Sequence, residues 1–435
     1  MALAEGAEAA EATAEHERRH ETALENGEVH TVRSDEETVF GLRVLVGGSL
    51  GFTTANQTGA DSLARAAAEA VAQARVTPTD PNNGLPLPRT VTPVESLVDE
   101  KLENMNAEES TALAVSLLER VRARDPRVRV DSGSVFGVAS ARAIASSQGM
   151  DLAESSVEAG GYLFGMAVDG DKVASSDYDG DATRRRESLE TVLEGAADRF
   201  VDKCVSGLDA GKGSSFKGSI LLSHDAVAEF LLPNLAPALG ADWVRKGQSL
   251  LAGKIGEAIA SELLTLSDDG TVAGGVASAS FDREGLPVER RVLIEKGVLA
   301  AYLYDDYEAR AAGIENSSGH ARGSAGSLPS LGPWRLELAP GSASEEDLEG
   351  GSGPLVIVNR FSGSTNPVTG DFSGVVKNGF LVEAGRSRPV QELMIAGNLF
   401  EMLHDISAVG AERRLVGTRC LVPALRAENI SVTAG

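Results

Sequence analysis

The sequence predicts an α+β protein in which an antiparallel N-terminal sheet with helices precedes a largely antiparallel β domain. A pattern of apolar strand, glycine-containing turn, strand and helix occurs twice before about residue 205, which indicates an internal duplication. From Leu264 to Val432, short strand candidates alternate with turns, as in antiparallel β domains. A glycine and serine cluster, Gly207 to Gly218, separates the two regions. We therefore expect an N-terminal domain over residues 1–210 and a C-terminal domain over residues 218–435.

The first copy of the pattern opens with hairpins. Asn26-Gly27 stands between extended polar runs, and Asn-Gly between such runs is a strong signal for a two-residue hairpin turn. Gly47-Gly48 is a second turn of this type. The expected elements are strands over Glu11 to Glu25, Glu28 to Asp35, Phe40 to Val46 and Ser49 to Thr54, followed by an alanine-rich helix over Asp61 to Arg75.

The second copy follows a helix predicted over Ala107 to Arg124. Its expected elements are extended structure broken by turns over Val128 to Ile144, strands within Gly161 to Ser176, and a helix over Glu187 to Cys204. Asp177, Asp179 and Asp181 resemble the start of a calcium-binding loop, but the required glycine and the closing glutamate are missing. We interpret this acidic segment as an ordinary turn.

A strand over Ser219 to Leu222 and a helix over His224 to Leu239 open the second half. Ser223 is suited to cap the start of this helix, and Gly240 is suited to end it. Pro233 is expected to kink the helix, because proline has no backbone N–H and its ring clashes with the preceding turn.

The composition excludes several kinds of partner. The chain has 64 acidic and 40 basic residues and a formal charge of −24, which repels nucleic acid phosphates and anionic membranes. Its two cysteines, Cys204 and Cys420, are too few for a disulfide framework and favour a reducing compartment. The start lacks a signal-peptide pattern, and no stretch approaches the roughly 18 apolar residues of a membrane span. We therefore expect a cytoplasmic protein.

The segment from His16 to His20 matches the His-Glu-x-x-His pattern of zinc proteases, which requires a helix. On a helix the two histidines would stand roughly 6 Å apart on one face. On a strand they would lie about 13 Å apart, too far to share one zinc ion. Because this segment leads directly into the Asn26-Gly27 hairpin, we predict a solvated strand and no metal site.

Three stretches of the second half carry a family resemblance. They are Ser362 to Ser373, which is dense in small polar residues, Ile395 to Leu399 and Ser318 to Gly323. Together they resemble the signature of the TldD/PmbA peptidase family, in particular its PmbA (TldE) branch. The resemblance implies that Gly319, His320, Arg322, Ser364, Thr365, Asn366, Gly370, Asp371 and Asn398 contact peptide or shape a shared chamber. Turn geometry is the alternative explanation for each of these residues.

The resemblance also implies where a zinc motif would stand. In the TldD branch a His-Glu-x-x-x-His motif lies on the first helix of the second domain, and an ungapped count places Leu232, Pro233 and Pro237 at its three functional positions. None of these side chains can bind zinc or transfer a proton. His224, Asp225 and Glu229 repeat the spacing about eight residues earlier, and with Cys420 they could form an unusual metal site.

The resemblance implies a TldE-like subunit without catalysis of its own. Such a chain would pair with a TldD-like zinc protease subunit, or self-associate, and help to enclose unstructured or modified peptides, with the zinc held by the partner. The alternative is an autonomous metal-dependent hydrolase acting on a peptide or a peptide-like metabolite. A third hypothesis is a binding protein that never joins a protease.

Overall fold

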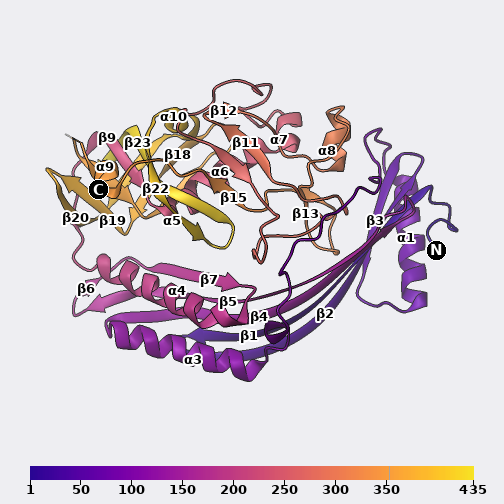
Figure 1. Cartoon of the computed structure of the whole chain (residues 1–435), viewed down its shortest axis with the longest axis horizontal. Coiled ribbons are helices and arrows are strands. Elements are labelled where there is room, and N and C mark those ends of the chain that lie inside the picture. The colour runs from indigo at the N-terminus through magenta and orange to yellow at the C-terminus, as the bar shows by residue number, and fades with distance from the viewer. Residues whose placement is uncertain (352) are drawn as a thin grey trace.

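The computed structural model describes residues 1–351 and 353–435 and confirms the predicted α+β class (Figure 1). The N-terminal unit, as we call the elements from β1 to α4, contains β1 (Ala9–Glu25), β2 (Glu28–Val46), β3 (Ser49–Ala55), α1 (Ala60–Val76), α2 (Glu100–Glu103), α3 (Ala107–Arg124), β4 (Val128–Ser146), β5 (Asp151–Asp169), β6 (Lys172–Val173), β7 (Asp177–Thr183) and α4 (Arg186–Ser206).

The N-terminal sheet is symmetric about its central pair of strands. Its order is β3-β2-β1-β4-β5-β6, with β7 also paired to β5, and β1 and β4 form the antiparallel centre. Helix α1 packs on β2 and β3, and α4 packs on β5 and β7. This arrangement of two similar strand and helix units is the one expected from the duplication in the sequence.

Local signals explain the hairpins and helices of this unit. Asn26 and Gly27 both have positive φ, as do Gly47 and Gly48, which is the backbone form that matches the twist of the flanking strands. Helix α3 begins with a capping box in which Asn106 and Glu109 exchange hydrogen bonds with each other's backbone N–H groups. The predicted hairpin turns and this helix are therefore confirmed, but the two strands predicted over residues 28–35 and 40–46 form one continuous strand, β2, because β1 pairs along its whole length.

Two predictions for the second copy are wrong. Residues 128–144 are not broken by turns but belong to one continuous strand, β4, with a single irregularity between Val130 and Ser132. Because β4 is paired on both edges, to β1 and to β5, the ladder outweighs the weak strand preference of its glycines. The acidic segment Asp177–Thr183 is the strand β7 rather than a turn, because it pairs with β5.

The C-terminal unit comprises the elements from β8 to β23. They are β8 (Gly211–Lys212), β9 (Phe216–Leu222), α5 (His224–Ala226), η1 (Val227–Leu231), α6 (Leu232–Leu235), η2 (Ala236–Leu239), α7 (Ala241–Arg245), β10 (Leu266–Asp268), β11 (Arg291–Glu295), β12 (Val298–Leu299), α8 (Asp306–Ala311), β13 (Ala321–Arg322), β14 (Ser330–Leu331), β15 (Leu336–Leu338), α9 (Glu345–Glu349), β16 (Leu355–Val358), β17 (Arg360–Thr365), β18 (Asp371–Lys377), β19 (Gly379–Glu383), β20 (Arg386–Gln391), β21 (Leu393–Asn398), α10 (Leu399–His404), β22 (Ile406–Val416) and β23 (Cys420–Ala434).

Most strands of the C-terminal unit pair antiparallel, as predicted, but the sheet is mixed. Parallel pairs join β9 to β16, β15 to β23 and β8 to β20. The main apolar core of this unit lies between the sheet and the helical segment from α5 to η2, and it includes Ile220, Leu231 and Leu425. The helical segment is therefore fixed firmly against the sheet.

This segment is helical over the predicted range but is not a regular α-helix. Ser223 caps its start by accepting a hydrogen bond from the N–H of Ala226 at 3.3 Å, and the segment ends at Gly240. A π-helical turn, η1, ends at Leu231, two residues before Pro233. A regular α-helix would need a backbone N–H at Pro233, which proline lacks.

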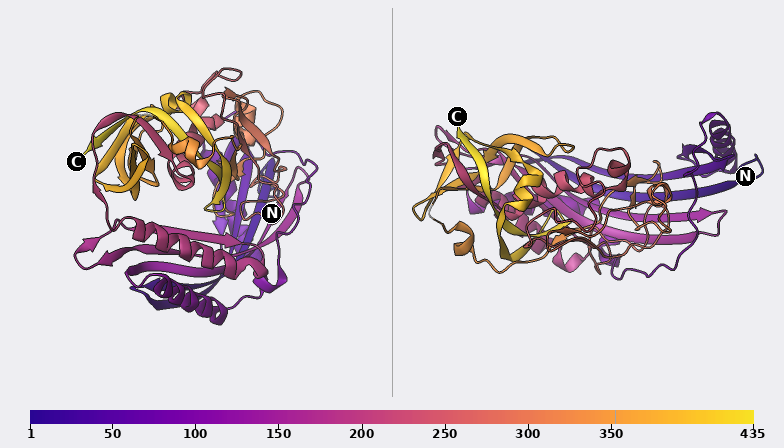
Figure 2. Two further views of the ribbon diagram at one scale, coloured as in Figure 1. Left: turned by 60° about the vertical axis from the view of Figure 1, so that its left-hand side comes forward. Right: turned by 90° about the horizontal axis from the view of Figure 1, so that it is seen from above.

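The two units meet through a buried ionic cluster. The strands of the N-terminal sheet are long and curve along the C-terminal unit, with α1 and the N-terminus at the far end (Figures 1 and 2). Arg43 on β2 binds Glu11 on β1 at 2.7 Å and Glu284 of the C-terminal unit at 2.8 Å, and none of these three side chains is more than 7% exposed. Arg283 adds a second cation 3.4 Å from Glu11.

Candidate functional site in a cleft between the two units

A cavity of about 310 Å³ lies between the N-terminal and C-terminal units. Strands β5 and β7 and helix α4 form one side, and the segment α5 to η1 and the end of β22 form the other. The lining residues are Tyr162, Tyr178, Asp179, Gly180, Arg199, Lys203, Asp225, Glu229, Arg414, Leu415, Val416 and Gly417.

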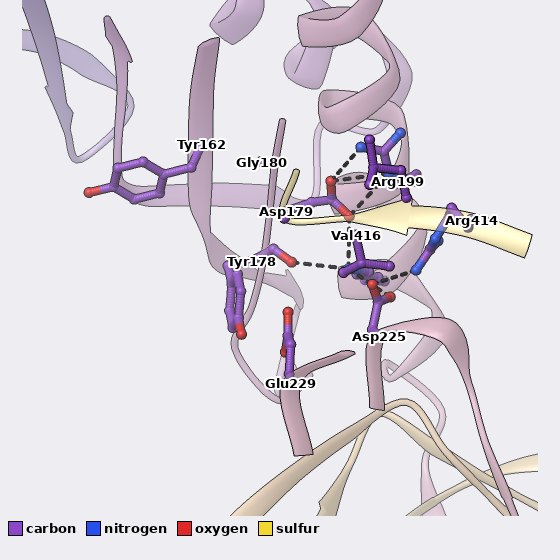
Figure 3. Close-up of a pocket in the computed structure, with 12 residues that line it drawn as sticks. Tyr162, Tyr178, Asp179, Gly180, Arg199, Asp225, Glu229, Arg414 and Val416 are labelled. Atoms are coloured by element: carbon purple, nitrogen blue, oxygen red, sulfur yellow. Dashed lines mark hydrogen bonds and ion pairs between the residues drawn. The ribbon is translucent and has the colours of Figure 1, made fainter. Parts of the chain in front are cut away.

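Most charges in this cleft neutralise one another across elements (Figure 3). Asp179 on β7 is 2.8 Å from both Arg199 and Lys203, which stand four residues apart on one face of α4. Lys203 is also 3.1 Å from Asp225 at the start of the opposite helix, and Asp225 binds Arg414 on β22. Although burial acts to raise the pKa of Asp225, Lys203 and Arg414 hold it below its ordinary value.

Glu229 is the exception, because it makes no ion pair with any described residue. Its carboxyl group faces the Tyr178 ring in the cleft (Figure 3). Burial raises the pKa of Glu229, and the neighbouring Tyr178 side chain opposes this effect only in part. Burial also raises the pKa of Tyr178. The cleft therefore holds two neighbouring groups with raised pKa values, a carboxyl group and a phenol, which can bind a polar ligand by donating and accepting hydrogen bonds.

The four residues proposed as an unusual metal site do not face one space. His224 lines a different cavity, where its Nε2 atom is 3.3 Å from the carbonyl oxygen of Glu412. Asp225 and Glu229 line the cleft, and Asp225 is occupied by two cations. Cys420 Sγ lies 4.0 Å from the carbonyl oxygen of Ala228, and burial raises the pKa of this thiol to about 11. Within residues 1–351 and 353–435, no group of three potential ligands comes together.

The positions expected for a zinc motif also lack donors. Leu232 is 1% exposed and belongs to the main apolar core. Pro233 and Pro237 follow in the same helical segment. A hydrocarbon side chain and two proline rings offer no nitrogen, oxygen or sulfur to a zinc ion, so these residues do not fit that cofactor.

The segment His16 to His20 lies on strand β1, as predicted. His16 Nδ1 is 2.9 Å from the hydroxyl group of Thr38, and His20 Nδ1 is 2.8 Å from the hydroxyl group of Ser34. Each histidine is therefore hydrogen-bonded to a different residue of the neighbouring strand β2.

The signature stretch Ser362 to Ser373 forms the hairpin of β17 and β18, and the polar side chains of its turn are hydrogen-bonded. Asn366 accepts hydrogen bonds from the N–H groups of Val368 and Thr369, as in an Asx turn. Gly370 has a φ of 82°, and its carbonyl oxygen accepts from Leu399. A side chain at Gly370 would also collide with the Phe400 ring.

Asn398 connects this hairpin to helix α10. Its Oδ1 atom caps the helix by accepting from Phe400 and Glu401. Its Nδ2 atom donates to the carbonyl oxygen of Thr369 at 2.8 Å and to Asp371 at 3.0 Å. Asn398 and Asp371 therefore have a structural role, which is the alternative that we gave for the signature residues.

Ser364 and Thr365 stand on strand β17, close to the turn of the hairpin. The Ser364 side chain is exposed and that of Thr365 is half-buried. Strand β17 pairs only with β18 among the described residues, so these two positions stay accessible for peptide contact.

The stretch Ser318 to Gly323 is mostly buried. His320 is fully buried and lies 2.8 Å from both Ser318 and Asp268. Gly319 has a φ of 73°, and its carbonyl oxygen accepts from the Trp334 ring N–H at 2.8 Å. Arg322 stacks its guanidinium group 3.6 Å from the centre of the Trp334 ring. His320 therefore supports the turn from inside the protein and does not present its ring to a peptide.

None of the nine residues taken from the signature lines the cleft of Figure 3. The cleft depends instead on Tyr162, Tyr178, Arg199, Lys203 and Arg414, which sequence reasoning did not single out. The sequence contained one signal for these charge pairs. Three aspartates, Asp177, Asp179 and Asp181, alternate with other residues, and two bases, Arg199 and Lys203, follow four residues apart. These spacings place the acids on one face of a strand and the bases on one face of a helix.

The fold and the cleft define a protein of two α+β units, and the cleft between them is lined by paired charges and by one acid, Glu229, without an ion pair to a described residue. Three family models match the chain: PmbA/TldA metallopeptidase domain 1 over residues 10–74, the central domain over residues 100–205, and the C-terminal domain over residues 215–434. The chain belongs to the PmbA/TldD metallopeptidase family.

Related sequences and structures agree with this assignment. The uncharacterized protein MJ0231 of Methanocaldococcus jannaschii is 32% identical over 308 residues, which are 70% of each chain. A metalloprotease of Methanothermobacter thermautotrophicus is 28% identical over 402 residues, covering 90% of this chain and 86% of the relative. The crystal structure of TldE from Thermococcus kodakarensis has a TM-score of 0.90 at 24% identity and covers 99% of this chain and 98% of its own. The similarity to this crystal structure, at 24% identity, shows a shared fold.

None of the helices in residues 1–351 and 353–435 combines the length and apolar character that a membrane crossing requires.

Proposed function

We propose that this chain is the TldE-like, catalytically silent subunit of a heteromeric protease in the cytoplasm. In this proposal a TldD-like partner carries the zinc ion, and the complex degrades or matures unstructured or modified peptides. The present chain contributes part of the wall around the peptide. Its accessible signature positions, Ser364 and Thr365 on β17, contact the peptide main chain.

The observation that supports the proposal is the absence of metal-donor atoms from three side chains of the helical segment beside the cleft, at the positions where the resemblance would place a zinc motif. Leu232 is buried in the core, and Pro233 and Pro237 have no donor atoms. The one cleft acid without an ion pair to a described residue, Glu229, lies near Tyr178 and Asp225, and no group of three potential metal ligands comes together within residues 1–351 and 353–435. Such a cleft can bind a polar chain but lacks the groups for peptide hydrolysis.

The test is reconstitution with a TldD-like chain that contains the His-Glu-x-x-x-His motif. The two purified chains are mixed and separated by size, the zinc content of each is measured, and cleavage of casein is followed with and without a chelator. We expect a mixed complex with zinc in the TldD-like chain, and cleavage that disappears with the chelator. We expect neither zinc nor cleavage for the present chain alone.

Two other outcomes correspond to the other hypotheses. Stoichiometric metal in the isolated chain, with cleavage that a chelator abolishes, would show an autonomous metal-dependent hydrolase. Failure to form any mixed complex would indicate a binding protein that works without a protease partner.

A further inference from the structure

A second and larger cavity, of about 730 Å³, opens on the other face of the C-terminal sheet. Its floor is a row of apolar side chains on four adjacent strands: Ala424 on β23, Leu221 on β9, Ile357 on β16 and Phe380 on β19. Leu221 pairs with Ile357, and Ile357 pairs with Phe380, so the row is continuous across the sheet. We call this cavity the α9 groove.

Helix α9 forms one wall of the α9 groove and is held in place at both ends. A capping box between Ser344 and Asp347 fixes its start. Leu348, on the inner side of the helix, is 5% exposed and packs in the same apolar cluster as Leu221. At the other end, Arg426 donates to the carbonyl oxygen of Leu348 at 3.3 Å and to that of Gly350. The groove is therefore a preformed feature of the surface.

The charged side chains on the rim are all acidic. Glu345 and Glu349 stand four residues apart on α9, and Glu412 lies opposite on β22. None of the three forms an ion pair within residues 1–351 and 353–435, and no described lysine or arginine lines the groove. Burial and the neighbouring Glu345 carboxylate raise the pKa of Glu349, which indicates a repulsion that a bound cation would relieve.

His224 does not supply that cation. It lines the same groove, but burial and the nearby Arg414 lower its pKa, so it is largely neutral at neutral pH. The groove thus combines an apolar floor with three carboxylates that form no ion pair with any residue that the structure describes.

We propose that the α9 groove binds an unstructured peptide segment in which lysine or arginine alternates with bulky apolar residues. The apolar side chains would cover Ile357 and Phe380 and remove their exposed area from water. The basic side chains would reach the rim glutamates, whose charges complement them. The proposal rests on the proposed function for taking the ligand as a peptide, and it deepens that function by naming the class of peptide. The charge of −24 favours the approach of such a cationic ligand.

The probe is a fluorescein-labelled peptide of alternating leucine and lysine, with matched peptides that carry glutamate in place of lysine or serine in place of leucine. Binding to the full chain is measured by fluorescence anisotropy in 0.15 M salt. We expect saturable binding of the leucine and lysine peptide, and at least tenfold weaker binding of both matched peptides.

The groove variant is Glu345→Gln, Glu349→Gln and Glu412→Gln together. We expect it to bind the leucine and lysine peptide about tenfold more weakly, a change of about 1.4 kcal/mol. The matched control changes the same amount of charge at exposed positions outside the groove, with Glu262→Gln, Glu295→Gln and Glu346→Gln. We expect the control to change the affinity less than twofold, and circular dichroism verifies that both variants are folded.

Three results would overturn the groove proposal: no saturable binding, equal binding of the glutamate peptide, or equal weakening by the groove and control variants. The same proteins are also tested for complex formation with the TldD-like chain. If the groove variant joins the complex normally but loses the peptide, both proposals hold. If peptide binding is as expected but no complex forms, the subunit proposal fails and the groove proposal stands.

Discussion

Arg43 links the two units, and its replacement should destabilise the folded protein. Its guanidinium group joins Glu11 of the N-terminal sheet at 2.7 Å to Glu284 of the C-terminal unit at 2.8 Å. The side chains of these two glutamates are 1% and 2% exposed. Replacing Arg43 by methionine keeps much of the side-chain length but leaves two buried carboxylates without their shared cation.

The expected loss follows from the burial of these groups. Removing one partner of a buried ion pair typically costs about 3–5 kcal/mol, because the remaining charge cannot return to water. Arg283, 3.4 Å from Glu11, compensates only one of the two carboxylates. We therefore expect Arg43→Met to lower the free energy of unfolding by about 3–5 kcal/mol near neutral pH.

Urea unfolding followed by circular dichroism measures this loss. The control is Arg33→Met, which also removes one positive charge but starts from a side chain that is 70% exposed. We expect the control to lose less than about 0.5 kcal/mol. Adding Glu11→Gln and Glu284→Gln to Arg43→Met should restore at least half of the loss, because neutral amides do not need a counter-ion.

A loss below about 1 kcal/mol, or no rescue by the two glutamine substitutions, would refute the view that a buried ionic cluster holds the two units together.

Three further predictions follow from individual side chains. Burial raises the pKa of Asp305 from 3.8 to about 7, so the stability that it contributes is complete below about pH 4 and is lost as pH rises through about 7. The free energy of unfolding of Asp305→Asn, measured in urea relative to the unsubstituted protein, should therefore be more favourable at pH 8 than at pH 5. An equal difference at both pH values would contradict this prediction. Asn398→Ala removes the cap of α10 and the hydrogen bond to Thr369, so it should lower the free energy of unfolding by about 1–2 kcal/mol. No change in that free energy would show that Asn398 does not hold the signature hairpin. Burial raises the pKa of Cys420 to about 11 and also raises the pKa of Cys204. Iodoacetamide at pH 8 should therefore label both thiols slowly in the native protein and rapidly in urea. Fast labelling of Cys420 in the native protein would support the hypothesis that it is a thiolate ligand.

The sequence alone determined the features that depend on neighbouring residues. Helix α3 begins and ends at the predicted residues because its capping box and its apolar spacing lie within one short stretch. The turns at Asn26-Gly27 and Gly47-Gly48 were predictable because positive φ is available to only a few residue types. The donor-free side chains at Leu232, Pro233 and Pro237 are likewise properties of the residues themselves.

The tertiary structure decided the features that depend on residues far apart in the chain. Strand β7 looked like a turn because its pairing with β5 has no local signal. The cleft joins Asp179 to Arg199 and Lys203 in one unit, and it joins Lys203 to Asp225 in the other. Residue types and spacing determine the chemistry that each side chain can perform. Whether a charge finds a neutralising partner is decided only by the packing of distant parts of the chain.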